Sequence, residues 1–369
     1  MANAFLIFVC FILAAYVIIQ AVHARAWLKF PVLKSNANTN TPDVTVIIAF
    51  RNEAEHLRDC IQGILSQNYP PDNLEILLLN DHSNDDSVES IAAYLQYPNV
   101  RLIDMPNHIQ GKKKSIAYGL KEAQSPFVLF TDADCIAGPG WIRKMMENMI
   151  ATEADAICGP VEIHNESNLL EQFQALDFAG MMAITAVSMK NNWFYLANGA
   201  NMLLRIETLD MNNISWQEEY ASGDDMSLIS HLQKKQAKIR FAKDKAAIVS
   251  TVAQPNLSDF FQQRLRWGTK NKSSKSILMI FQLGLAYLAS LSSMIALVCI
   301  FFDIKFLFII LLKLIGDLIL LMSVAPYFKK QAHLMKMPLF SLMHSTYIAL
   351  VGTLSLLPLR YEWKGRIVK

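Results

Sequence analysis

The sequence is poor in cysteine: its 369 residues include five, namely Cys10, Cys60, Cys135, Cys158 and Cys299. None of them forms a C-x-x-C pair, and two lie in the very apolar ends of the chain. This spacing argues against a structural zinc site and against a disulfide framework, and it suits a reducing compartment.

A large net charge is also absent, since 34 Lys and Arg residues against 32 Asp and Glu residues leave a net charge of +2. So small an excess argues against a broad surface for polyanions, and we expect no nucleic-acid partner. Hydrophobic residues, in contrast, make up 53% of the chain, which is high for a soluble protein. They are concentrated at the two ends, whereas residues 35–275 have an ordinary soluble composition.

The first apolar end is the uninterrupted run Ala4–Val22, and no Lys or Arg precedes it. A bilayer span takes roughly 20 residues, whereas the apolar core of a cleaved signal peptide usually has ~7–15. We therefore expect an uncleaved transmembrane anchor over residues 1–34, although Ala24–Ala26 faintly resembles a cleavage site. Basic residues follow the run, and positive charge stays on the cytoplasmic side, so residues 35–275 should face the cytosol.

The second apolar end, residues 276–369, is predicted to be a membrane region of two or three helices with a basic tail. Ile277–Phe302 and Ile304–Tyr327 each have the length of a span, and they are joined at Asp303. Lys313 and Asp317 share one helix face of the second span. Charges at that depth usually pair and face protein rather than lipid.

A third apolar run, Pro338–Pro358, leaves its own topology open. Basic residues flank it on both sides, so both flanks favour the cytosol although a single crossing would separate them. A re-entrant or an interfacial segment is the alternative to a crossing.

The middle of the chain alternates between strand-like apolar runs and helical patterns. The predicted strands cover residues 43–50, 74–81, 100–105 and 126–132, and the predicted helices cover 53–67, a stretch from 85, and 112–123. This alternation predicts an α/β fold with parallel β-α-β units and a sheet covered on both faces. Ligands of such sheets bind beyond the carboxyl ends of the strands, where Asn52, Asp81, Asp132 and Asp134 fall.

Two of these acids, Asp132 and Asp134, end the fourth apolar run only one residue apart. Asp134 as a helix cap would explain one of them but not both. Like charges this close repel each other unless a cation or a proton relieves them. Mg²⁺ and Mn²⁺ prefer carboxylate oxygens and usually hold phosphates as well, so the pair predicts a divalent metal bound to a diphosphate.

The segment Asp43–Lys270 resembles a family-2 glycosyltransferase with the GT-A fold, a Rossmann-like fold of nucleotide-diphospho-sugar transferases. Five pieces match in order: IIAFRNE, LLNDHSND, GKKKSIAYG, DAD, and GDD followed by QQRLRW. The last piece, Q-x-x-R-W, is typical of processive and lipid-linked members. A GT-A domain over residues 35–275, flanked by membrane helices, is what this resemblance implies.

The resemblance also implies roles on the donor side. Asn52 and Glu53 are expected to line the nucleotide pocket, where the alternative is the opening of a helix. Asp81 is expected to contact the base or the ribose, although the turn-forming residues around it also suit a plain turn. The Gly111–Lys112 segment is expected to meet a phosphate.

The metal and acceptor roles follow in the same way. Asp134 is expected to bind the metal directly, and Asp132 to support the ribose or reach the ion through water. Asp225, or its neighbour Asp224, is expected to take the proton from the attacking hydroxyl, although acids also favour the first turn of a helix.

The Q-x-x-R-W motif consists of Gln263, Arg266 and Trp267. Arg266 is expected to stabilise the leaving diphosphate, and Trp267 to form a wall of the acceptor site. A basic amphipathic helix lying on the membrane is the plainer interpretation.

We therefore expect an inverting, metal-dependent transfer of a sugar from a nucleotide-diphosphate donor to a lipid or lipid-linked acceptor, and a UDP-sugar is the expected donor. A processive polysaccharide synthase and a non-catalytic membrane scaffold are the alternatives. The expected location is a bacterial inner membrane with the catalytic domain in the cytosol. The sugar, the acceptor and the oligomeric state leave no readable mark in the sequence.

Overall fold

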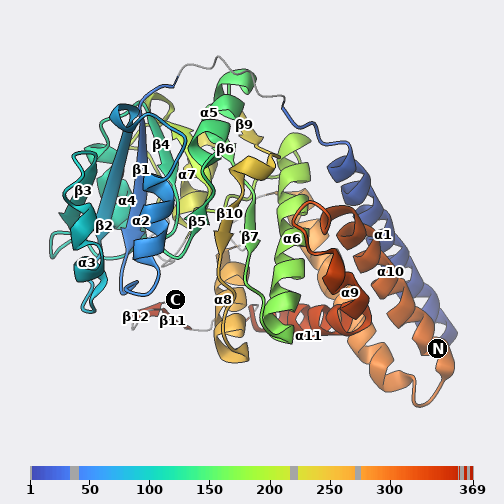
Figure 1. Cartoon of the computed structure of the whole chain (residues 1–369). Helices are drawn as coiled ribbons and strands as arrows, with labels where there is room; N and C mark the ends of the chain where they lie inside the picture. The colour runs from blue at the N-terminus through green and yellow to red at the C-terminus, as the bar shows by residue number, and fades with distance from the viewer. Residues whose placement is uncertain are drawn as a thin grey trace. The chain divides into compact units, whose positions relative to one another are not determined.

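The computed structural model describes residues 2–33, 41–216, 223–270, 276–355, 357, 361–363 and 366–368. Its internal contacts divide the chain into two compact units, and Figure 1 draws the elements of both. The sheet unit consists of Pro31–His164, Tyr195–Val252 and Glu362–Lys369. The helical unit consists of Met1–Phe30, Asn165–Phe194 and Ala253–Tyr361.

A seven-stranded sheet forms the centre of the sheet unit, in the order β3-β2-β1-β4-β8-β6-β9. Its strands are β1 (Val44–Phe50), β2 (Leu74–Asn80), β3 (Val100–Asp104), β4 (Phe127–Phe130), β6 (Ala156–Cys158), β8 (Met202–Arg205) and β9 (Ile239–Phe241). The first four pair in parallel, as predicted, whereas β8 runs antiparallel to both β4 and β6. The α/β class and the parallel pairing of these four strands are confirmed, and antiparallel β8 makes the sheet a mixed one.

Strand β1 is buried on both faces, and Val46, Ile47 and Ile48 have no exposed surface. Helix α4 (Lys112–Glu122) packs on β1 and β2. The approach is so close that a Cβ on Gly119 would lie 2.5 Å from a methyl group of Leu79. Glycine at this position therefore allows α4 to sit directly on the sheet, which fixes the place of its first residue, Lys112.

The remaining elements of the sheet unit surround this sheet. They include a three-stranded sheet of order β5-β10-β7. The elements are β5 (Ile136–Ala137), β7 (Val161–Ile163), β10 (Val249–Thr251), α2 (Leu57–Leu65), α3 (Ser87–Ser90), α5 (Trp141–Thr152) and α7 (Asp224–Lys234). The short strands β11 (Tyr361–Trp363) and β12 (Arg366–Val368) pair with each other near the C-terminus.

The helical unit is built from six long helices. They are α1 (Ala2–Leu28), α6 (Leu169–Lys190), α8 (Leu257–Lys270), α9 (Ile277–Cys299), α10 (Leu307–Val324) and α11 (Met337–Ser355). Within this unit α1 packs along α10, and α9 packs along α11 (Figure 1). Helix α6 is buried along most of its length and contacts both α1 and α10.

Four described segments are long and apolar enough to cross a membrane: Leu6–Leu28, Ile277–Cys299, Ile304–Val324 and Gln331–Ser355. They include the predicted N-terminal anchor and the two predicted C-terminal spans. The third apolar run forms helix α11 as far as Ser355, and its crossing of the membrane remains a prediction.

The predicted pairing inside the second C-terminal span is confirmed. Lys313 Nζ donates to both oxygens of Asp317 at 2.7 Å, and the two side chains are 0% and 6% exposed. Because the two charges are paired and face protein, neither is left alone in apolar surroundings, where an isolated charge is costly.

The contacts group the chain differently from the predicted division at residues 1–34, 35–275 and 276–369. Helices α6 and α8 fall in the predicted catalytic segment. They pack instead with the candidate membrane spans, because their apolar side chains are buried against those helices. The predicted boundaries therefore remain a prediction. Most of the predicted basic tail, including Arg360, Lys364 and Lys369, lies outside the described residues, as does Lys34.

Candidate active site

The loops that follow β1 and β2 are tied to each other. Asn52 adopts the left-handed conformation with φ 53°, which asparagine tolerates better than most residues. Its Oδ1 accepts a hydrogen bond from the Asn84 backbone N–H at 3.0 Å, and its own N–H donates to Ser83 Oγ at 3.1 Å. The Glu53 N–H donates to Ser87 Oγ at 2.8 Å. These turns explain why α2 begins at Leu57 rather than at residue 53.

Asp81 follows the end of β2 and anchors the start of α4. Its side chain is almost fully buried, and its two oxygens accept the Gly111 backbone N–H at 3.0 and 3.1 Å. Gly111 has φ 97°, a conformation that a residue with a Cβ adopts only with strain. The predicted Asp81 and Gly111 positions are therefore adjacent, and together they set where Lys112 begins the helix.

The acid pair lies in the loop after β4. One ligand atom from each of Asp132, Asp134 and Cys135 can be chosen so that all three lie within 4.8 Å of one another. Burial, together with the two carboxylates, raises the pKa of the Cys135 thiol well above its usual range. The thiol is 3.4 Å from Asp134 Oδ1, within reach of a hydrogen bond.

These features test whether the loop suits a metal ion. A protonated thiol is a poor ligand for a hard cation, whereas two half-buried carboxylates offer the oxygen ligands that Mg²⁺ and Mn²⁺ prefer. Asp132 and Asp134 therefore fit a divalent ion that keeps further positions for phosphate oxygens or water.

Lys112 connects this loop with the acids of α7. Its ammonium group pairs with Asp132 Oδ1 and lies 4.0 Å from Asp224 Oδ2. Burial disfavours the charged lysine, but the Asp132 and Asp224 carboxylates outweigh this effect and raise its pKa. Lys112 is therefore a fixed cation between the two groups of acids.

Asp224 and Asp225 open α7, as predicted, and both are buried. Gly223 precedes them in the left-handed region with φ 102°, which turns the chain into the helix. Asp225 Oδ2 accepts the Gly199 backbone N–H at 3.3 Å, and its Oδ1 accepts the Met226 N–H at 2.7 Å. The backbone at Gly199, just before β8, thus lies against Asp225.

The structure brings together Asp132, Asp134, Lys112, Asp224 and Asp225, with the Asp81–Gly111 contact at the start of the same helix. All of them belong to the sheet unit. Their individual roles remain predictions.

The Q-x-x-R-W residues Gln263, Arg266 and Trp267 lie on α8 of the helical unit. Trp267 packs against Phe178, with ring centroids 5.8 Å apart, and the Arg264 guanidinium lies 4.3 Å from its ring centroid. The motif analysis did not select Arg264, which is the buried arginine of this helix. The only sequence signal for it is a basic residue at helical spacing from Phe260 and Trp267.

Comparisons with known proteins show which family the chain resembles. Residues 127–359 match the model of glycosyl transferase family group 2, and residues 45–206 match that of glycosyl transferase family 2. A poly-beta-1,6-N-acetyl-D-glucosamine synthase of Staphylococcus epidermidis is 21% identical over 272 residues, which cover 71% of this chain and 64% of the synthase. Glycosyltransferase AglE of Haloferax volcanii is 25% identical over 172 residues, 46% of this chain and 54% of AglE.

The chain therefore spans about half to two thirds of the length of these curated relatives. Among solved structures, the mannosyltransferase PcManGT of Pyrobaculum calidifontis, in complex with GDP-Man and Mn²⁺, superposes with a TM-score of 0.60. The superposition covers 96% of this chain and 99% of PcManGT at 16% identity, which shows a shared fold. A family model that spans more than half of the chain shows the family: the protein belongs to glycosyl transferase family group 2 and has the GT-A fold.

Proposed function

We propose that this glycosyltransferase moves a sugar, with inversion, from a nucleoside-diphosphate donor to a hydroxyl group of a membrane lipid, in a reaction that depends on Mg²⁺ or Mn²⁺. The observation that carries the proposal is the position of Lys112 between Asp132 and Asp224. Lys112 joins the acids of the predicted metal loop to the predicted catalytic acids of α7. A transferase needs its metal-binding acids and its catalytic base close enough together to act on the same bound donor sugar.

On the donor side, Asp134 and Asp132 would hold the divalent ion, which neutralises diphosphate charge when it is bound. Lys112 adds a fixed positive charge beside them. A nucleoside would lie against the loops that carry Asn52, Glu53 and Asp81. Mn²⁺ and GDP-Man bound to PcManGT support a metal and a nucleotide-sugar donor, and both UDP- and GDP-sugars are candidates.

On the acceptor side, Asp225 would take the proton from the attacking hydroxyl, with Asp224 as the alternative base. A positioned carboxylate typically contributes ~10²–10⁴-fold in rate. The Gly199 N–H holds one Asp225 oxygen and the Met226 N–H the other, so the orientation of the carboxylate is set by the backbone. Arg266 and Trp267, with Gln263, would meet the diphosphate and the acceptor, and this part rests on their motif alone.

The proposed location is a bacterial inner membrane with the sheet unit in the cytosol. Arg25 and Lys29 directly follow the first candidate span, and positive charge is retained on the cytosolic side. Reporter fusions placed after residues 33 and 303 would test this topology, since activity of a periplasmic reporter at residue 33 contradicts it.

The central experiment is transfer of radiolabelled sugar into a lipid extract by membranes that contain the full chain. Asp134→Ala and Asp225→Asn should abolish transfer, and chelation of divalent ions with EDTA should do the same until Mn²⁺ or Mg²⁺ is restored. Asp72→Asn is the matched control, because Asp72 is an exposed acid of the same unit outside these loops. Wild-type transfer by either active-site variant would refute the proposed roles.

A processive polysaccharide synthase is the second candidate. The names of the Staphylococcus relatives and the Q-x-x-R-W motif favour it. The small number of candidate spans weighs against it, since a polymer channel needs more helices unless chains assemble. Gel separation of the labelled product decides between them: a ladder of long polymers supports the synthase, and a single lipid-sized band supports the lipid transferase.

A further inference from the structure

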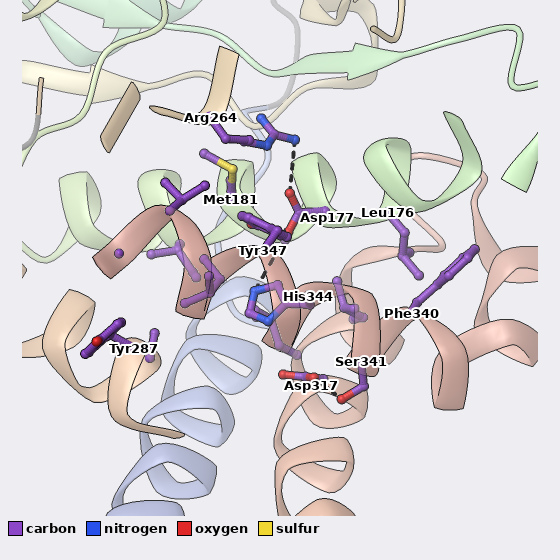
Figure 2. A pocket seen from close by; sticks show the side chains of 18 of the residues that line it. Leu176, Asp177, Met181, Arg264, Tyr287, Asp317, Phe340, Ser341, His344 and Tyr347 are labelled. Atoms are coloured by element: carbon purple, nitrogen blue, oxygen red, sulfur yellow. Dashed lines mark hydrogen bonds and ion pairs between the residues drawn. The ribbon is translucent and has the colours of Figure 1, made fainter. Parts of the chain in front are cut away.

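The helical unit contains a cavity of about 330 Å³ whose wall is mostly apolar. All four candidate membrane spans contribute to this wall, and helices α6 and α8 complete it. The volume falls within the ~300–1,000 Å³ that is usual for small-molecule sites. Figure 2 shows the side chains that face this cavity, including a line of polar groups from Arg264 to Asp317.

Arg264 carries unused hydrogen-bonding capacity in this wall. Its Nη2 donates to Asp177 Oδ2 at 3.1 Å, and the side chain is only 3% exposed. Its Nε and Nη1 have no hydrogen-bond partner among the residues that the structure describes. Buried donors are normally paired, because leaving one unpaired costs free energy. Two such donors on a cavity-lining arginine indicate a bound oxygen-containing group.

The acids of the cavity, in contrast, are occupied. Asp177 Oδ1 accepts the Tyr347 hydroxyl at 2.9 Å. Asp317 accepts Lys313, and also the hydroxyls of Tyr16 and Ser341 at 2.6 Å each. Two cations therefore face two carboxylates, so these four groups are formally neutral. His344 lies 3.1 Å from Lys313 Nζ and 3.8 Å from Asp177 Oδ1, and it leaves this balance unchanged in its neutral form.

Charge balance decides which headgroup suits the site. A phosphate would add negative charge to a neutral, buried site, and uncompensated burial of charge is costly. A fully ionised phosphate also only accepts hydrogen bonds, whereas the wall offers a buried acceptor without a partner in the described part of the chain, Gln20 Oε1. Hydroxyl groups both donate and accept, so a hydroxyl-bearing headgroup matches both kinds of unpaired group in this wall.

We infer that this cavity binds a lipid by one aliphatic chain and an uncharged, hydroxyl-bearing headgroup, with the headgroup at Arg264. The apolar wall provides the environment for the chain, and the buried donors and acceptor fix the polar end. The inference concerns binding within the helical unit and needs no nucleotide donor. It therefore stands or fails separately from the proposed transfer reaction.

The test uses the full chain in detergent without any donor. A photoactivatable diacylglycerol is cross-linked to the protein, and a photoactivatable phosphatidic acid with the same chains is the anionic comparison. Wild-type protein should be labelled by diacylglycerol more strongly than by phosphatidic acid, on peptides of α6 and α11. Equal labelling, stronger labelling by phosphatidic acid, or no labelling of these peptides would overturn the inference.

Two variants locate the site. Met181→Trp fills the cavity and should lower diacylglycerol labelling roughly tenfold, which corresponds to about 1.4 kcal/mol. Met322→Trp is the matched control, because Met322 is exposed and does not line the cavity. Identical labelling of the two variants contradicts binding in the cavity.

Arg264→Lys keeps the positive charge beside Asp177 but removes the planar set of donors. We expect this variant to retain its thermal unfolding transition and to lose the preference for the hydroxyl lipid. An unchanged preference in folded Arg264→Lys would show that Arg264 does not hold the headgroup.

Discussion

Lys112 Nζ lies 4.0 Å from Asp224 Oδ2, so the first residue of α4 and the first residue of α7 meet, although 112 positions separate them in the sequence. Asp132 Oδ1 forms an ion pair with the same ammonium group. The fold thus neutralises, with one lysine, carboxylates that would otherwise repel each other. Substitutions at this lysine are the most direct probe of the site.

Lys112→Met should lower kcat/KM for sugar transfer by about 10²-fold, in the range seen when one charge-stabilising group is removed. The variant loses the positive charge beside the diphosphate and leaves Asp132 and Asp224 without their shared cation. Steady-state kinetics with the labelled donor measures the effect. Lys114→Met, at an exposed position two residues further along α4, is the control and should stay near wild type. Equal kinetics for the two variants would exclude a role for Lys112.

Gly199→Ala should reduce turnover without unfolding the protein. A Cβ at this position would lie 3.3 Å from Asp224 Oδ2, so that carboxylate would have to move, and it would lie 3.7 Å from Asp225 Cβ, in direct contact with the second acid. We expect about a tenfold fall in kcat, because small misplacements of catalytic groups are costly. Gly138→Ala adds the same methyl group where nothing lies within 4 Å, and it should leave kcat unchanged. A fully active Gly199→Ala protein would argue against Asp225 as the base.

The Lys313–Asp317 pair should show the signature of a buried ion pair in a double-mutant cycle. Lys313→Met alone leaves Asp317 buried beside hydroxyl groups without its cation, which typically costs about 3–5 kcal/mol of unfolding free energy. Lys313→Met combined with Asp317→Leu removes both charges and should recover most of this loss. Thermal or denaturant unfolding in detergent measures the unfolding free energies of the single and the double variant. Independent, additive effects would mean that the two charges do not interact.

His231 makes stability depend on pH in the sheet unit. Burial lowers its pKa below the ordinary value of 6.5, with Lys235 acting in the same direction, and its Nε2 accepts the Asp210 N–H at 3.2 Å. The folded state therefore prefers the neutral ring, so this stabilisation is present above pH 6.5 and is lost as the pH falls toward the folded pKa.

Melting curves between pH 7.5 and 5.5 should accordingly shift less in His231→Gln than in wild type. His108→Gln, at an exposed histidine, serves as the control and should keep the wild-type pH dependence. If the melting temperatures of His231→Gln and wild type depend on pH in the same way, the His231 ring does not contribute to the pH dependence of stability.

Much of the sheet unit was predictable because its signals are local. The run Val44–Phe50 is rich in β-branched residues and apolar at most buried positions, and the Gly223–Asp225 turn combines a glycine with acids that favour a helix start. The convergence of Asp132 and Asp224 was suggested only by family resemblance, since no local pattern encodes contact between residues so distant in sequence.

The helical unit was harder to predict for a physical reason. Helix α6 is mostly buried but carries polar and charged residues and lies in the predicted soluble segment, so composition alone does not reveal that α1 and α10 are its partners. The Arg264–Asp177 pair spans 87 positions and depends on this packing. Antiparallel β8 was likewise invisible, because strand direction depends on the connections between strands rather than on their composition.

The interleaved path of the chain has a practical consequence for producing this enzyme. The helical unit collects three separate stretches, so trimming both ends to obtain residues 31–252 would strand α6 without the helices that cover its apolar surface. Such a fragment is expected to aggregate in aqueous buffer. Purification should therefore retain the whole chain in detergent or nanodiscs from the start.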